Sequence, residues 1–196
     1  MTSLSNVLGL PEEPRLTIRD YNKTLEEWCK EMHLSVETES SVMNAQIVLL
    51  PESYKDCTTA FALSADDFYN YCKKSNLLSV EICCEEEDFT KLELCSSKLR
   101  LGKIFSTSTI SGAIIWSLVS GYIKDTIDSA VVDKPAVEQV IEDNPTFLSE
   151  PECSFSVIVR DSTTGKFVEV KYDGPVSGIE EAGDQIIKIT GNGNKD

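Results

Sequence analysis

The chain has 196 residues, 41% hydrophobic and 26% charged, a composition typical of one globular domain and unlike that of a disordered chain. Its 33 acidic and 18 basic side chains give a net charge of −15, which repels phosphate backbones and anionic lipid headgroups. We therefore expect no nucleic-acid partner. The acidity either serves solubility or forms a face for a basic protein partner.

The seven cysteines predict a reducing compartment and not a disulfide framework. Their number is odd, and several lie in apolar runs such as SVEICC and KLELC, as small core residues do. No CxxC pair occurs and His33 is the only histidine, so the spacing predicts no metal site. Residues 1–15 lack a basic region followed by a long apolar run, so we expect no secretory signal and a cytoplasmic location.

The N-terminal half predicts two helices and short strands. The segment RDYNKTLEEWCKEMHL places apolar residues on one helical stripe, and either a capping box of Thr24 and Glu27 or a cap at Asp20 begins that helix. AQIVLL and CTTAFAL predict strands separated by the loop PESYKD, and Ser64 predicts the start of the second helix.

Two stretches with alternating apolar residues predict antiparallel hairpins. The first, LLSVEICCEEEDFTKLELCSSKL, would turn at the acidic run EEED. The second, SFSVIVRDSTTGKFVEVKYDG, would turn at DSTTGK. The alternation in the second hairpin predicts the core face: Phe155, Val157 and Val159 aligned with Val168, Val170 and Tyr172.

The remaining C-terminal segments predict a short helix over 133–143, a linker or exposed loop over 143–152, and a last strand, QIIKIT. The fold class is therefore α+β, with a mixed, largely antiparallel sheet packed against amphipathic helices and one long apolar helix. We expect an N-terminal α+β part over 1–103, the apolar helix over 104–128, and a C-terminal hairpin part over 129–196 that forms one compact domain with 1–103.

The uncharged stretch 104–123 predicts either a helix buried under the sheet or a single membrane span, because twenty helical residues match a hydrocarbon core of about 30 Å. Its first third is rich in Ser and Thr, so the continuously apolar part begins near residue 110. The small residues Ala113, Ser117 and Gly121 form a stripe suited to helix packing or self-association. A span would anchor the protein in the inner membrane, with the N-terminal part in the cytosol. A buried helix would require hydrogen-bond partners for Trp116 and Tyr122.

No catalytic, cofactor-binding or metal-binding residues are predicted, and we expect no enzyme and no cofactor. The only dense glycines, GNGN, are followed by no helix that would bind a phosphate, and no carboxylate pair has a context that would separate its pKa values. A protein-interaction module fits best, with Arg160, Glu169 and Lys171 on the exposed hairpin faces as candidate partner contacts. A single-span membrane effector or tether is the first alternative, and a small hydrolase with an unrecognised site is the second. The sequence does not define the oligomeric state.

The order LGKIFSTSTISGAIIWSLVSGYIKD, then FSVIVRDSTTGKFVEVKYDGP, resembles the effector-associated constant-component modules of bacterial conflict systems. In these modules a helix rich in small apolar residues precedes a two-stranded hairpin with a short polar turn. The resemblance covers residues 101–189 and departs by an acidic insert between residues 127 and 153. It implies a non-enzymatic adaptor, or an immunity-type component, of a bacterial defence system, and it supplies no catalytic residues.

Overall fold

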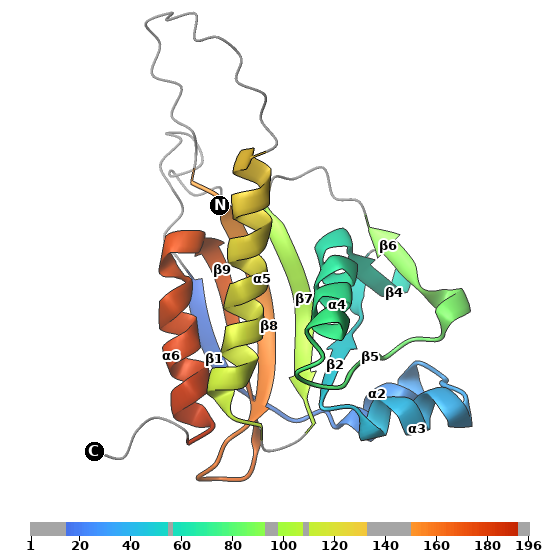
Figure 1. The fold of residues 1–196 in the computed structure, drawn as a ribbon. Helices are drawn as coiled ribbons and strands as arrows, with labels where there is room; N and C mark the ends of the chain where they lie inside the picture. Colours follow the sequence, from blue (N-terminus) through green and yellow to red (C-terminus); the bar gives the residue numbers. More distant parts are fainter. Residues whose placement is uncertain (1–14, 55–56, 93–97, 108–109, 133–149, 192–196) are drawn as a thin grey trace, which may run out of the picture.

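The computed structural model describes residues 15–54, 57–92, 98–107, 110–132 and 150–191, which form an α+β fold around a mixed sheet (Figure 1). The six strands of this sheet, in spatial order, are β1 (Arg15–Tyr21), β9 (Phe167–Pro175), β8 (Glu152–Arg160), β7 (Leu99–Ser106), β2 (Ile47–Leu50) and β5 (Val80–Ile82). The β7–β8 and β2–β5 pairs are parallel and the other three are antiparallel. Both halves of the sequence therefore contribute strands to one sheet.

A smaller sheet and five α-helices complete the described fold. The small sheet contains β3 (Glu52–Tyr54), β4 (Cys57–Ala62) and β6 (Thr90–Leu92). The helices are α2 (Leu25–Glu31), α3 (Val36–Asn44), α4 (Leu63–Ser75), α5 (Gly112–Val132) and α6 (Ile179–Ile189), with short 3₁₀ turns at Glu86–Asp88 and Val176–Gly178.

The helices cover the two faces of the large sheet unequally. Helices α4, α5 and α6 lie on one face, the helix face, and enclose the larger core (Figure 1). Helix α2 and the end of α3 pack on the opposite face, where Leu25, Trp28 and Val42 meet Val48 and Phe105. This smaller core lies over β2, β7 and the adjoining ends of the other strands. The rest of the second face is polar and forms the candidate site described below.

The predicted hairpin of β8 and β9 is confirmed in its register. Phe155 pairs with Tyr172, Val157 with Val170 and Val159 with Val168, and all six side chains are buried. In the turn, the Asp161 carboxylate accepts hydrogen bonds from the Thr163 and Thr164 amides at 2.6 and 3.0 Å. Gly165 adopts the left-handed backbone conformation, with φ +71°. Alternation along both strands was enough to predict this hairpin because its two halves are adjacent in the sequence.

Two other strand predictions are wrong. The first predicted hairpin does not form, because β5 pairs with β2 and β6 pairs with β4 in the second sheet. The acidic run between them forms the 3₁₀ turn at Glu86–Asp88, and the Glu85 carboxylate accepts a hydrogen bond from the Ser35 amide at the start of α3, at 2.5 Å. The predicted strand QIIKIT belongs to helix α6, whose buried Ile179, Ala182 and Ile186 have helical spacing.

The predicted long apolar helix over 104–123 is also wrong. Residues 104–106 end strand β7, and the Ser/Thr-rich segment separates that strand from helix α5, which begins at Gly112. The second half of α5 carries the charged residues Lys124, Asp125 and Asp128. Among the helices of the described residues, none is long and apolar enough to cross a membrane.

The buried part of α5 confirms the expected polar contacts. Trp116 Nε1 donates to a Glu180 carboxylate oxygen at 3.3 Å, and the Tyr122 hydroxyl donates to the Ser64 carbonyl at 3.1 Å. Ser64 does not cap α4, since that helix begins at Leu63. The predicted helix over 133–143 and residues 143–149 of the predicted linker lie outside the described residues.

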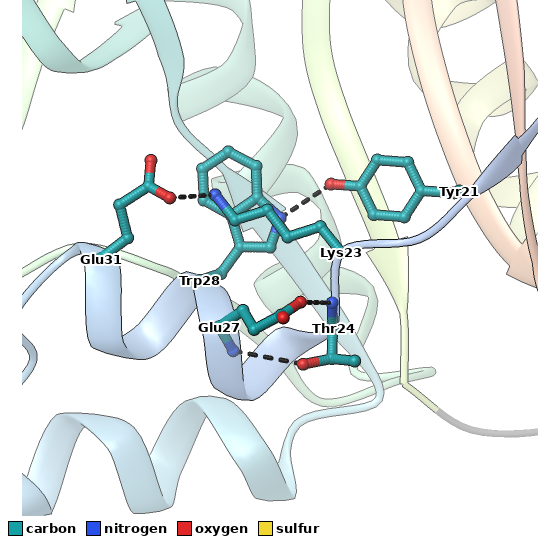
Figure 2. A network of polar contacts seen from close by, with 6 residues as sticks. All are labelled: Tyr21, Lys23, Thr24, Glu27, Trp28 and Glu31. Atoms are coloured by element: carbon teal, nitrogen blue, oxygen red, sulfur yellow. Dashed lines mark hydrogen bonds and ion pairs between the residues drawn. The ribbon is translucent and has the colours of Figure 1, made fainter.

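The capping box of helix α2 is confirmed (Figure 2). The Glu27 amide donates to Thr24 Oγ1 at 3.3 Å, and the Thr24 amide donates to the Glu27 carboxylate at 2.7 Å. We expect Thr24→Ala to lower the free energy of unfolding by about 1 kcal/mol, because the Glu27 amide loses its acceptor, Thr24 Oγ1. Urea denaturation measures the loss, and an unchanged midpoint would contradict the cap.

Candidate functional site

The candidate site is the exposed part of the sheet face opposite α4, α5 and α6. Residues that are paired across neighbouring strands project from the same face, so the strand register places their side chains. The register joins Arg19 to Glu169, Thr17 to Lys171, Lys171 to Ser156, and Ser156 to Lys103. We call this surface the charged sheet face. Its members are Arg15, Thr17, Arg19, Lys98, Arg100, Lys103, Glu152, Ser154, Ser156, Glu169, Lys171 and Asp173.

The sign of the charge on this face is opposite to that of the whole chain. Six of the named side chains are cationic and three are carboxylates, which gives a local balance of +3 on a chain of net charge −15. The helix-covered side differs, since α6 alone exposes Glu180, Glu181 and Asp184. The molecule therefore presents an acidic helix layer on one side and a locally cationic sheet surface on the other.

Glu169 is the centre of the charged sheet face and is 1% exposed. One carboxylate oxygen accepts the Ser156 hydroxyl at 2.6 Å, and the other pairs with Arg19 Nε. Burial opposes ionisation, but the hydrogen bonds from Ser156 and Arg19 and the charges of Arg19 and Lys103 outweigh it, so the pKa of Glu169 is lowered. The carboxylate is thus ionised at neutral pH and holds Arg19 over the sheet.

A second ion-pair group lies further along the same face. Lys98 Nζ pairs with Asp173 and lies 3.5 Å from a Glu152 carboxylate oxygen. Arg100 lies opposite Ser154, and its Nε is a buried donor for which the described structure provides no hydrogen-bond acceptor.

Tyr21 and Trp28 form an aromatic corner next to Lys103 of the charged sheet face, and Figure 2 shows the polar contacts of this corner. Trp28 Nε1 donates to the Tyr21 hydroxyl at 2.7 Å, which ties α2 to the end of β1. Lys23 Nζ lies 3.2 Å from the centroid of the Trp28 ring and pairs with Glu31, and Lys103 Nζ lies 5.6 Å from that ring. These contacts fix the position of α2 beside the exposed strands.

The three candidate contact residues occupy the expected face, with different exposure. Lys171 is exposed near the centre of the charged sheet face. Arg160 is exposed at the hairpin turn, where its Nε donates a hydrogen bond to the Gly165 carbonyl at 3.0 Å. Glu169, which we expected to be exposed, is buried because Arg19 and Ser156 contact it. The sequence does not predict Arg19 as a contact residue, although the alternation of polar and apolar residues in RLTIRDY is typical of a strand.

The predicted stripe of small residues makes a close helix contact inside the molecule only at Gly121, where a Cβ atom would lie 2.8 Å from the Tyr71 hydroxyl of α4. Ala113 and Ser117 are exposed on α5. Helices α5 and α6 instead approach each other at Gly112 and Gly183. A Cβ atom at Gly112 would lie 2.7 Å from the Ile186 carbonyl oxygen, and one at Gly183 would lie 2.2 Å from the Trp116 ring. Self-association through the exposed stripe stays a prediction.

The described cysteines have the environment of core residues. Cys29, Cys72, Cys83, Cys84 and Cys153 are buried and unpaired by disulfides. Burial raises the pKa of both Cys72 and Cys153 to about 12, which disfavours the nucleophilic thiolate. The described residues contain no group of three or more His, Cys, Asp or Glu side chains that could hold a metal ion.

Fold and surface together define an α+β protein with one sheet face covered by α4, α5 and α6 and a second face that is partly covered by α2 and α3 and is otherwise charged. Nothing among the family models, the curated proteins or the solved structures compared with this chain matches it.

Proposed function

We propose that the protein is a non-enzymatic protein-interaction module and that the charged sheet face is its binding surface. The observation that carries this proposal is the ion-pair network around buried Glu169, which holds Arg19 in place beside exposed Thr17 and Lys171. Charged side chains that are already ordered lose less conformational entropy when a partner binds. Fixed charges on an exposed surface also discriminate between partners by charge complementarity.

The wider setting of the proposal is a cytoplasmic adaptor, or an immunity-type component, of a bacterial defence system. The resemblance of residues 101–189 to effector-associated constant-component modules supports this setting. In the described fold, α5 precedes the hairpin of β8 and β9, which is the element order of those modules. The proposed role therefore requires binding and no chemical step.

Site-specific photocrosslinking in cells of the source organism tests the proposal. A photoreactive amino acid at Thr17, in the charged sheet face, should give one discrete crosslinked product containing a second protein. The matched control is the same amino acid at Ser117, which is exposed on α5 on the other side of the sheet. We expect no discrete product from position 117.

A charge reversal on the same face provides the second control. Lys171→Glu should reduce the Thr17 crosslink about tenfold by placing a carboxylate beside Glu169 and Asp173, whereas Lys188→Glu on α6 should leave it unchanged. A discrete product from position 117 and none from position 17 would contradict the proposal. That result would instead assign binding to the acidic helix layer, the side suited to a basic partner.

A further inference from the structure

We propose that β1 binds an extended segment of the partner by strand addition, and that acidic and apolar residues alternate along that segment. The inference rests on the proposed function and specifies the partner of the same surface. Three features of β1 carry it: its position at the sheet edge, the exposure of its side chains, and the different chemistry of its two faces.

Strand β1 is an edge strand with a complete ladder on one side. All seven of its residues pair with β9, and no other described strand pairs with it. Arg15, Thr17, Ile18, Arg19 and Asp20 are exposed, and within the described part of the chain no strand pairs with the outer side of β1. In an antiparallel ladder, every second residue directs its N–H and C=O away from the partner strand. These groups form a template for one more strand.

The two faces of β1 select different side chains in an added strand. Arg15, Thr17 and Arg19 project from the charged sheet face, opposite Asp173, Lys171 and Glu169 of β9. On the helix face, Leu16 packs partly against the core, Ile18 is 45% exposed, and exposed Asp20 follows at the end of the strand. Side chains that are directly opposite in paired strands lie about 5 Å apart at Cβ and interact. Carboxylates therefore fit the first face and apolar side chains fit the second.

The same features disfavour a second copy of the chain and a nucleic acid. Antiparallel pairing of two β1 strands would bring the Arg15 and Arg19 side chains of both copies onto one face, where like charges repel. A polyphosphate carries a charge at every residue and has no amide groups to pair with the strand edge, and it would meet a chain of net charge −15. A partner with alternating residues places its carboxylates at the arginines and gains main-chain hydrogen bonds.

A synthetic peptide of alternating Glu and Val, seven residues long like β1, is the direct probe. Binding to the full chain is measured by fluorescence anisotropy of the labelled peptide. We expect binding that weakens as salt is added, with slower amide hydrogen exchange over residues 15–21 of the protein. A peptide of alternating Lys and Val, and the Glu–Val peptide with one N-methylated amide in its centre, should bind at least about tenfold more weakly.

Two matched isoleucine variants locate the binding site. Ile18→Glu removes an apolar contact and adds a like charge, so it should weaken peptide binding about tenfold. Ile114→Glu changes an isoleucine of similar exposure, 43%, on α5, and should leave binding unchanged. Both substituted side chains are partly exposed, and equal thermal unfolding midpoints for the two variants would confirm that each one folds.

The outcomes separate this inference from the proposed function. A Thr17 crosslink to a partner, together with no binding of the Glu–Val peptide, would overturn strand addition and leave the interaction surface intact. Absence of the Thr17 crosslink would overturn both. Peptide binding that is equally sensitive to Ile114→Glu, or tighter binding of a single-stranded oligonucleotide of the same charge, would also overturn the inference.

Discussion

Replacing Gly183 by alanine is expected to lower the free energy of unfolding by about 2 to 3 kcal/mol, although alanine is the better helix former by about 1 kcal/mol. The new Cβ would lie 2.2 Å from Trp116 Cε2 and 2.5 Å from Nε1, closer than non-bonded atoms approach. The Trp116 ring is held by Phe155, with ring centroids 6.1 Å apart, and by its hydrogen bond to Glu180. Helix α6 must therefore move away from α5 to accept the methyl group.

Urea denaturation of Gly183→Ala, Trp116→Phe and the double variant tests this contact. The smaller Phe ring should relieve part of the clash, so the double variant should be more stable than the sum of the two single effects predicts. Ala113→Leu on the exposed side of α5 is the control and should change stability by less than about 0.5 kcal/mol. If Gly183→Ala were as stable as the native protein, the α5–α6 contact would be wrong.

Removing the buried carboxylate should have the second-largest effect. We expect Glu169→Ala to lower the free energy of unfolding at pH 7 by about 2 kcal/mol, because charge-assisted hydrogen bonds of a buried group contribute about 1.5 to 3 kcal/mol. In this variant the exposed Arg19 guanidinium can hydrogen-bond to water instead of Glu169, but the buried Ser156 hydroxyl loses its acceptor. Ser156→Ala removes one of the two partners and should cost less.

The effect of Glu169 should depend on pH in a defined direction. The folded protein lowers the pKa of this carboxyl, so its ionised form stabilises the fold above the unfolded-state pKa, near 4.5. That contribution is lost as the pH falls through the lowered pKa of the folded state. The stability difference between the native protein and Glu169→Gln should therefore be largest at pH 6 to 7 and shrink toward pH 3. A difference that grows on acidification would contradict the ion-pair network.

The parts of the fold that the sequence predicts are those determined locally. Alternation over adjacent segments predicts the β8–β9 hairpin, and the spacing of Thr24 and Glu27 predicts the start of α2. β5 pairs with β2 although β3, β4 and α4 lie between them in the chain, and local sequence patterns do not predict a pairing over that distance. The apolar residues of 179–189 are compatible with both helical and strand spacing. This segment forms a helix because its apolar side chains then pack on β8 and β9.

The candidate site was only partly predictable for the same reason. Alternation along β9 places Glu169 and Lys171 on the face opposite the core, and this placement is confirmed. The burial of Glu169 depends on Arg19, which comes from a strand 150 residues earlier in the sequence. The α5–α6 contact at Gly183 likewise depends on Trp116, whose ring position follows from tertiary packing. The spacing of residues in the sequence predicts which face of a strand or helix a side chain lies on, whereas contacts between distant segments determine whether that side chain is buried.

The most direct test of the binding surface is an amide hydrogen-exchange footprint of the protein bound to the partner captured through Thr17. Exchange should slow over β1 and β9, residues 15–21 and 167–175, and stay unchanged over the exposed side of α5. Protection confined to α5 and α6, with β1 and β9 exchanging as in the free protein, would show that the charged sheet face is not the interaction surface.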